Sequence, residues 1–272
     1  MPVVTTSDRT ELYVKDWGSG RPVVLIHGWP LSADSWEHQA MALADAGYRV
    51  IAYDRRGFGR SGQPWSGYDY DTMADDLAQV IGDLGLTDAT IAGFSMGGGE
   101  VSRYMSRHDG KGVKQAVLIS SIAPFMGDAD GWPGVGADVI QGIKDGLRTD
   151  RQNFLATFFE DFFGQGTPGG GVSDEVRHWA WMQAMWASPK ATLDCVDAFA
   201  TTDLRPDMAA FGVPTLVIHG DADKTVPIDA TGKKAAELIG GSEFKTYDGA
   251  PHAVTATHAD RLSKDLLAFL ES

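Results

Sequence analysis

The 272-residue sequence has few features that would tie the chain together or anchor it to a membrane. It contains one cysteine, Cys195, so no disulfide can form within the chain. No apolar run approaches the roughly 20 residues that cross a bilayer. Residues 1–10 lack the charged-then-apolar order of a signal peptide. We therefore expect a cytoplasmic protein that does not enter membranes.

Positive charge is also scarce. The sequence has 23 Lys and Arg against 37 Asp and Glu, which gives a formal net charge of −14. Nucleic acids and anionic lipids attract basic surfaces, so we expect neither as a partner. Hydrophobic residues make up 43% of the chain and charged residues 22%, as in ordinary soluble proteins. This composition favours a protein that acts on neutral or weakly charged small molecules.

Apolar runs alternate with amphipathic segments along most of the chain. Runs that are apolar throughout, rather than at every second residue, predict strands buried on both faces. We predict strands at residues 12–14, 22–26, 48–53, 89–92, 113–120, 213–220 and 243–247. Helical spacing predicts helices at residues 35–46, 70–84, 100–108, 228–239 and from 256 or 257 to 269. This alternation is typical of an α/β fold with a mostly parallel, doubly wound sheet.

The pattern changes after Ile122. Residues 124–146 are broken by proline and glycine, and helices are predicted at 150–163, 173–186 and 189–201, with no strand from 125 to 206. We therefore expect a core of residues 1–124 and 207–272, with a helical cap of residues 125–206 inserted in it. The insertion is rich in aromatic residues, most of which we expect to pack against one another. The predicted substrate pocket comprises Pro30 and, as candidate apolar walls, Phe125, Phe158 and Phe162.

The segment Gly93-Phe94-Ser95-Met96-Gly97 has the form G-x-S-x-G. It lies between a predicted strand and a predicted helix, which is the context of a nucleophilic serine on a sharp turn. Glycines two residues before and after the serine remove Cβ atoms that would collide in such a turn. The alternative is a glycine-rich turn with an incidental serine. A nucleophile at Ser95 requires a base, an acid and an oxyanion site elsewhere in the chain.

His252 is the best-placed base among seven histidines. Catalytic groups of such sheets collect where the strands end, and His252 lies in the loop after the last predicted strand. His27 and His219 also end strands, but each directly precedes a glycine, so we expect structural hydrogen bonds to the backbone there. The remaining histidines fall in helical or polar segments and are expected at the surface: His38, His108, His178 and His258.

A carboxylate must orient the base, and Asp223 is the preferred candidate. Asp221 follows the same strand but lies within the tight turn, and Asp248 is so close in sequence to His252 that we expect it to anchor the loop. The order Ser95, Asp223, His252 is that of α/β-hydrolases.

An oxyanion site needs two backbone N–H donors. Met96, the residue after the nucleophile, supplies one from the turn itself. Trp29, in the loop after the strand at residues 22–26, is the natural second donor. Pro30 has no N–H, but it restricts Trp29 to extended backbone and thereby holds the Trp29 amide in place.

Two other motifs point to different chemistry but have simpler explanations. Residues 57–62 match the G-x-G-x-x-G pattern of dinucleotide-binding folds, yet Gln63-Pro64-Trp65 follows where a helix should begin. Cys195 lies among apolar residues of a predicted helix and is expected to be a buried hydrophobic residue. No histidine or carboxylate cluster has metal-ligand spacing, so we expect no metal.

Together these residues resemble the α/β-hydrolase superfamily, and most closely the bacterial cofactor-free haloperoxidases and aryl esterases. The resemblance spans residues 11–270. The segments that carry it are His27-Gly28-Trp29-Pro30, Tyr53-Asp54-Arg55-Arg56-Gly57-Phe58-Gly59-Arg60-Ser61, Gly93-Phe94-Ser95-Met96-Gly97-Gly98-Gly99-Glu100, Asp203-Leu204-Arg205-Pro206-Asp207, His219-Gly220-Asp221-Ala222-Asp223 and Ala250-Pro251-His252.

The resemblance implies hydrolysis of small carboxylic esters, with perhydrolysis as a second activity. In perhydrolysis hydrogen peroxide replaces water and releases a peracid, which oxidises halide in solution without metal, haem or flavin. The Pro30 carbonyl would face the site and accept a hydrogen bond from the peroxide. The resemblance also implies a homo-oligomer, a trimer or larger. Ser95 distinguishes the chain from relatives with an aspartate nucleophile.

Three alternatives stay open at this point. The substrate can be a lactone or an amide, because the same acyl chemistry serves both. Hydrolysis of a carbon–carbon bond in dienone acids would need an arginine in the cap, for which Arg148, Arg151 and Arg177 are candidates. A non-catalytic ligand-binding protein on the same fold is the third, although such a protein has no need of all three catalytic roles.

Overall fold

Eight strands form a single sheet in the computed structural model, which describes residues 2–272. The strands are β1 (Val3–Thr5), β2 (Glu11–Gly18), β3 (Pro22–Ile26), β4 (Arg49–Tyr53), β5 (Ala89–Phe94), β6 (Val113–Ile119), β7 (Thr215–Gly220) and β8 (Glu243–Tyr247). Their order in the sheet is β1-β2-β4-β3-β5-β6-β7-β8. Only the pairs β1–β2 and β2–β4 are antiparallel. The predicted mostly parallel, doubly wound α/β sheet is therefore confirmed.

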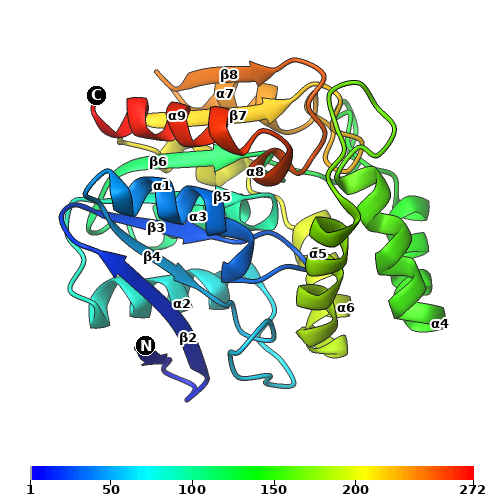
Figure 1. The fold of residues 1–272 in the computed structure, drawn as a ribbon, viewed down its shortest axis with the longest axis horizontal. Helices are drawn as coiled ribbons and strands as arrows, with labels where there is room; N and C mark the ends of the chain where they lie inside the picture. The colour runs from blue at the N-terminus through cyan, green and yellow to red at the C-terminus, as the bar shows by residue number, and fades with distance from the viewer. Residues whose placement is uncertain (1) are drawn as a thin grey trace.

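Helices cover both faces of this sheet and one of its ends. They are α1 (Glu37–Asp45), α2 (Tyr70–Asp83), α3 (Met96–Arg107), α4 (Ala137–Phe162), α5 (Asp174–Trp186), α6 (Pro189–Thr201), α7 (Gly232–Leu238), α8 (Val254–Thr257) and α9 (Ala259–Leu270), with short 3₁₀ turns η1 (Ala33–Trp36) and η2 (Arg205–Ala210). In Figure 1, α1 and α9 lie together on the near face, and α2 and α3 on the far face. The central strands β3 and β5 are almost wholly buried, which explains their continuous apolar sequences.

Several predicted elements have different bounds in the structure. β1 is additional, and β2 is longer than the predicted strand at residues 12–14. The helix predicted at 228–239 begins only at Gly232, because residues 227–231 form a turn in which Thr231 Oγ1 donates to Pro227 O at 2.8 Å. The closing helix is two helices, α8 and α9, which meet at His258.

Between β6 and β7 the structure contains α4, α5, α6 and η2, with only two isolated β-bridges among the described residues. α4 begins at Ala137, inside the stretch of residues 124–146 that the sequence predicts to be broken. Its backbone departs from helical geometry at Asp150, where φ is −154° and ψ is 83°. The division into a core and a cap of residues 125–206 stays a prediction.

The arrangement gathers loops at one end of the sheet. Figure 1 shows α4, α5 and α6 beyond the end toward which the arrows of the parallel strands point. β5 leads into Ser95, β7 into Asp223 and β8 into His252, all at this end. Crevices at the carboxyl ends of strands are where open α/β sheets bind ligands. Within residues 2–272, no helix combines the length and apolar character needed to span a membrane.

Candidate active site

Ser95 lies on a sharp turn between β5 and α3. Its φ of 54° and ψ of −120° place a non-glycine residue in a strained region of backbone space. The close approach of neighbouring chain explains the flanking glycines: a Cβ on Gly93 would lie 2.3 Å from Gly97 O, and one on Gly97 would lie 2.4 Å from Ile26 O. The sequence G-x-S-x-G therefore folds into a turn that other residues would not permit.

The structure brings the three predicted side chains of the site together. Asp223 Oδ2 accepts a hydrogen bond from Nδ1 of His252 at 2.7 Å, and Ser95 Oγ lies 2.9 Å from His252 Nε2. Because the carboxylate can only accept, the imidazole carries its proton on Nδ1 and accepts the Ser95 hydroxyl proton at Nε2. The His252 ring packs against the rings of Phe94 and Phe162, whose centroids each lie 5.1 Å from its own. The imidazole is thus shielded from water and fixed in orientation.

The Asp223 carboxylate is fully buried and bonded on both oxygens. Oδ1 accepts the backbone N–H groups of Thr225 at 2.9 Å and Val226 at 2.8 Å. Burial raises the pKa of Asp223, but the imidazoles of His252 and His219 outweigh it and hold that pKa well below its usual value. Asp223 is therefore ionised throughout the neutral range.

The other two carboxylates considered from sequence do not reach the base. Asp221 is exposed, and its Oδ1 accepts Gly249 N–H at 2.6 Å. Asp248 is also exposed, with no side-chain hydrogen bond among the described residues. The structure therefore places only Asp223 beside His252.

The backbone amides of Trp29 and Met96, near Ser95, have no acceptor within residues 2–272. Met96 is the first residue of α3, and the first N–H groups of a helix have no partner within it. Trp29 follows β3 by three residues. Its indole N–H donates to Thr192 O at 3.0 Å, which fixes the side chain against α6. Free amides on both loops are what an oxyanion site requires.

A buried network lies beneath the Trp29 loop. Arg55 donates from Nε to Glu100 at 2.7 Å and from Nη2 to His27 O at 2.9 Å, and Tyr53 also bonds Glu100. His27 accepts the Arg55 backbone N–H at Nε2, at 3.0 Å, and donates from Nδ1 to Gly28 O. Burial and the Arg55 guanidinium hold the pKa of His27 far below its usual value, so this ring stays neutral. The predicted structural role of His27 is confirmed.

A cavity of about 40 Å³ lies beside Ser95. Apart from Ser95, His252 and Thr225 its lining is apolar, and comprises Trp29, Ile122, Met126, Ile143, Phe158, Phe199 and Val226. A single water needs about 10–15 Å³ on such a measure, so the cavity holds about three waters or a short acyl chain. Away from Ser95 and His252, the apolar walls favour an uncharged acyl chain in this space.

Of the four predicted pocket residues, only Phe158 lines this cavity. Phe125 does not: its ring packs instead against the Arg205 guanidinium, 5.2 Å away. Phe162 lies behind the imidazole, in contact with Phe94 and His252. Pro30 is buried in the turn closed by Leu31 N–H to Gly28 O, and no N–H of the described chain donates to the Pro30 carbonyl.

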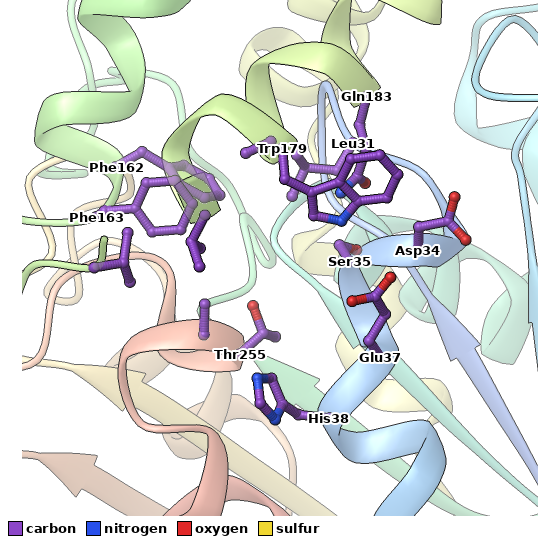
Figure 2. A pocket seen from close by; sticks show the side chains of 14 residues that line it. Leu31, Asp34, Ser35, Glu37, His38, Phe162, Phe163, Trp179, Gln183 and Thr255 are labelled. Carbon is purple, nitrogen blue, oxygen red and sulfur yellow. The ribbon is translucent and has the colours of Figure 1, made fainter. Parts of the chain in front are cut away.

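A second cavity, of about 120 Å³, lies on the other side of Phe162. Figure 2 shows Phe162 and Phe163 on one side of it and Trp179 on the other, with Thr255 and His38 below. None of its lining residues lines the cavity beside Ser95. The two spaces are therefore separate in this structure.

None of the three cap arginines considered from sequence lines the Ser95 cavity. Arg148 and Arg177 pair with acidic residues of their own helices, and Arg151 donates to the carbonyls of Ala184 and Ala187. Cys195 is fully buried, which raises the pKa of its thiol to about 12. In the part of the chain that the structure describes, no three His, Cys, Asp or Glu side chains are grouped to hold a metal.

Sequence reasoning missed most of the cavity wall and one histidine contact. Ile122, Met126 and Ile143 come from segments without a motif, so no local signal identifies them. The predicted backbone hydrogen bond of His219 is confirmed by Val226 O at 3.1 Å, but its Nε2 also lies 3.2 Å from Asp223 Oδ2. The i, i+4 spacing of these two residues across a turn was the only available signal.

Comparisons with known proteins agree with this geometry. A family model described as alpha/beta hydrolase fold matches residues 21–259. The chain is 46% identical to a non-heme chloroperoxidase of Kitasatospora aureofaciens, over 99% of each chain. It is 40% identical to a bifunctional esterase/perhydrolase of Acinetobacter calcoaceticus, over 100% of each. The crystal structure of a bromoperoxidase from Bacillus anthracis superposes with a TM-score of 0.96 at 45% identity, covering 100% of this chain and 99% of that one.

Proposed function

The chain belongs to the alpha/beta hydrolase fold family, and from that premise we propose that it is a serine hydrolase of small carboxylic esters with perhydrolase activity. Its most similar relatives include non-heme haloperoxidases and an esterase/perhydrolase, which supports both activities. An esterase from Exiguobacterium antarcticum, 33% identical over 99% of each chain with a TM-score of 0.95, supports ester hydrolysis. Short-chain and aryl esters are the proposed substrates.

In the proposed mechanism Ser95 Oγ attacks the ester carbonyl carbon while His252 Nε2 takes its proton. The amides of Trp29 and Met96 stabilise the oxyanion. The intermediate collapses, and the leaving alcohol takes the proton from His252, which leaves an acyl-enzyme. Water then attacks the acyl carbon, gives its proton to His252 and releases the acid as Ser95 is reprotonated.

In perhydrolysis hydrogen peroxide takes the place of that water. One peroxide oxygen attacks the acyl carbon, His252 accepts its proton, and the product is a peracid with Ser95 restored. The peracid oxidises halide to hypohalous acid in solution and becomes the carboxylic acid. We propose that the Pro30 carbonyl accepts a hydrogen bond from the peroxide, because it has no backbone donor of its own.

The observation that carries the proposal is the pair of contacts on His252, 2.9 Å to Ser95 and 2.7 Å to Asp223. A parallel assay of 4-nitrophenyl acetate hydrolysis and of peracid formation from acetate and peroxide tests it. We expect both activities without added metal or cofactor. Labelling of Ser95 by a fluorophosphonate probe separates this enzyme from a non-catalytic binding protein, which would not react. Activity on ring-fission dienone acids, with none on simple esters, would favour the carbon–carbon hydrolase instead.

Replacing Ile143 by alanine should shift the acyl preference toward longer chains. The side chain lines the small cavity from α4, so its truncation makes room for additional methylenes. Each methylene that becomes buried contributes about 0.8 kcal/mol, or roughly fourfold in kcat/KM. The measurement is kcat/KM for nitrophenyl acetate, butyrate and hexanoate. Ile140→Ala, also half-buried on α4 but outside the cavity lining, is the control, and equal profiles for the two variants would contradict the assignment.

Replacing Pro30 by leucine should lower the ratio of perhydrolysis to hydrolysis. The substitution changes the turn that presents the Pro30 carbonyl, and loss of one hydrogen bond corresponds to about a 2- to 10-fold change. Peracid formation and ester hydrolysis are measured on the same preparation. Pro124→Leu is a matched control because the Pro124 carbonyl already accepts Leu204 N–H at 2.9 Å. An unchanged or raised ratio of perhydrolysis to hydrolysis in the Pro30 variant would contradict the proposed hydrogen bond from peroxide to the Pro30 carbonyl.

Cytoplasmic location and a homo-oligomeric state of three or more subunits stay predictions. The first rests on sequence composition and the second on the resemblance to haloperoxidases.

A further inference from the structure

His219, the next-to-last residue of β7, is fully buried and has no place in the mechanism above. Its Nε2 lies 3.1 Å from the carbonyl oxygen of Val226 and 3.2 Å from Asp223 Oδ2. Both neighbours are acceptors, so the proton of the ring must be on Nε2. The other nitrogen, Nδ1, has no partner and faces Gly232, on which a Cβ would come within 2.6 Å of it. The two acceptors therefore fix a proton on Nε2 and orient the ring.

The two acceptors of His219 belong to one tight turn, residues 223–226. Within this turn Asp223 Oδ1 accepts the N–H groups of Thr225 and Val226. His219 donates to the carbonyl of Val226 and so connects the far end of the turn to β7. The side chains of Thr225 and Val226 line the cavity beside Ser95. One imidazole thus fixes both the acid that orients His252 and part of the substrate wall.

We propose that His219 is a positioning residue that presents Asp223 Oδ2 to His252 and holds the wall of the acyl cavity. Asp223 Oδ2 then has two imidazoles beside it, His252 at 2.7 Å and His219 at 3.2 Å. The N–H dipole of His219 points its positive end toward this region and offsets part of the carboxylate charge. The Asp223 carboxylate is consequently fixed in place beside His252, and its electrostatic attraction for a protonated His252 is slightly reduced. This inference rests on the proposed hydrolase mechanism.

Loss of the His219 N–H should shift the pH dependence of activity in one direction. Removing the His219 N–H leaves the full carboxylate charge to stabilise the protonated form of His252. The base then stays protonated to higher pH, so the acid limb of the kcat/KM profile moves upward. No titratable group besides Asp223 and His252 is in recorded contact with either imidazole within residues 2–272. Asp221 and Lys224, which flank Asp223 in the chain, and Asp248 in the His252 loop are exposed.

The test compares His219→Phe with His219→Gln. Phenylalanine removes the donor at similar size, whereas glutamine places an N–H near the position of Nε2. For His219→Phe we expect kcat for nitrophenyl acetate to fall by about 10- to 100-fold, as misplacement of a catalytic group by about 1 Å produces. The acid limb should move to higher pH, and the low-field Nδ1 proton signal of His252 in the NMR spectrum should shift or broaden. His219→Gln should restore most of kcat and the position of the limb.

Leu216→Ala is the matched control for a purely structural role, because Leu216 is a fully buried apolar residue of the same strand, three residues before His219. It should lower thermal stability without moving the pH limb or the NMR signal. If His219→Phe behaves as Leu216→Ala does, or if the glutamine variant restores nothing, the positioning role is wrong. The NMR signal needs no turnover, so a failure of the ester hydrolase proposal would appear as absent activity in wild type, with the signal of His252 still dependent on His219.

Discussion

Ser95→Ala is expected to lower kcat for 4-nitrophenyl acetate by about 10⁴- to 10⁶-fold, the loss that follows removal of a serine nucleophile when the remainder of the site is intact. The hydroxyl is the only group in the site placed to attack, because Ser95 Oγ alone lies at hydrogen-bond distance from His252 Nε2. Peracid formation should fall by the same factor, since both activities pass through one acyl-enzyme. Stopped-flow absorbance should show that the stoichiometric burst of nitrophenol has disappeared.

The matched control for that loss is Ser102→Ala, on the helix that follows the nucleophile. Ser102 is also buried, but its hydroxyl donates to Gly98 O at 2.8 Å rather than to His252. Burst amplitude should stay near one per chain in this variant. Retention of wild-type turnover by Ser95→Ala would contradict the assignment of Ser95 as the nucleophile. Loss of turnover in both variants would indicate damage to α3 instead.

The sequence predicted the core of the fold better than the cap, for a physical reason. Strands such as β3 and β5 are buried on both faces, so their composition alone reveals them. α4 is half-exposed and contains Gly142 and Gly146, which sequence rules treat as helix breakers. Gly146 is needed because a Cβ there would lie 2.3 Å from the Phe154 ring. Glycine is required at position 146 by a contact across the bend at Asp150, and the sequence does not reveal such a contact.

The candidate site divides in the same way. Ser95, Asp223 and His252 follow strands whose ends meet at one edge of the sheet, so topology and order along the chain were enough to propose them. The pocket depends on side chains that meet across the cap. Phe125 is predicted in its wall as an aromatic residue of the insertion, yet packing with Arg205 holds its ring elsewhere. Composition identifies which residues can line a pocket, and tertiary contacts select those that do.

Asp223→Asn should reduce kcat by about 10⁴-fold although it keeps the size of the side chain. The amide oxygen must face the N–H groups of Thr225 and Val226, which now donate to Asp223 Oδ1 at 2.9 and 2.8 Å. The amide NH₂ is then directed at His252 Nδ1. Two donors cannot face each other, so the imidazole takes its proton on Nε2 instead and can no longer accept the proton of Ser95.

The comparison that discriminates is with Asp221→Asn and Asp248→Asn. Both side chains are exposed, and neither reaches His252. Asp221 lies in the loop that carries Asp223, and Asp248 lies in the loop that carries His252. We expect each to retain activity within about twofold of wild type, because a surface carboxylate contributes little to a buried site that it does not touch. Stopped-flow kinetics with nitrophenyl acetate measures all three on one scale. A large loss in the Asp248 variant, with activity retained in Asp223→Asn, would assign the acid to the loop after β8 and remove Asp223 from the site. The expected order follows from burial: Asp223 is buried, with imidazoles beside one oxygen and two amides on the other, whereas Asp221 and Asp248 are exposed.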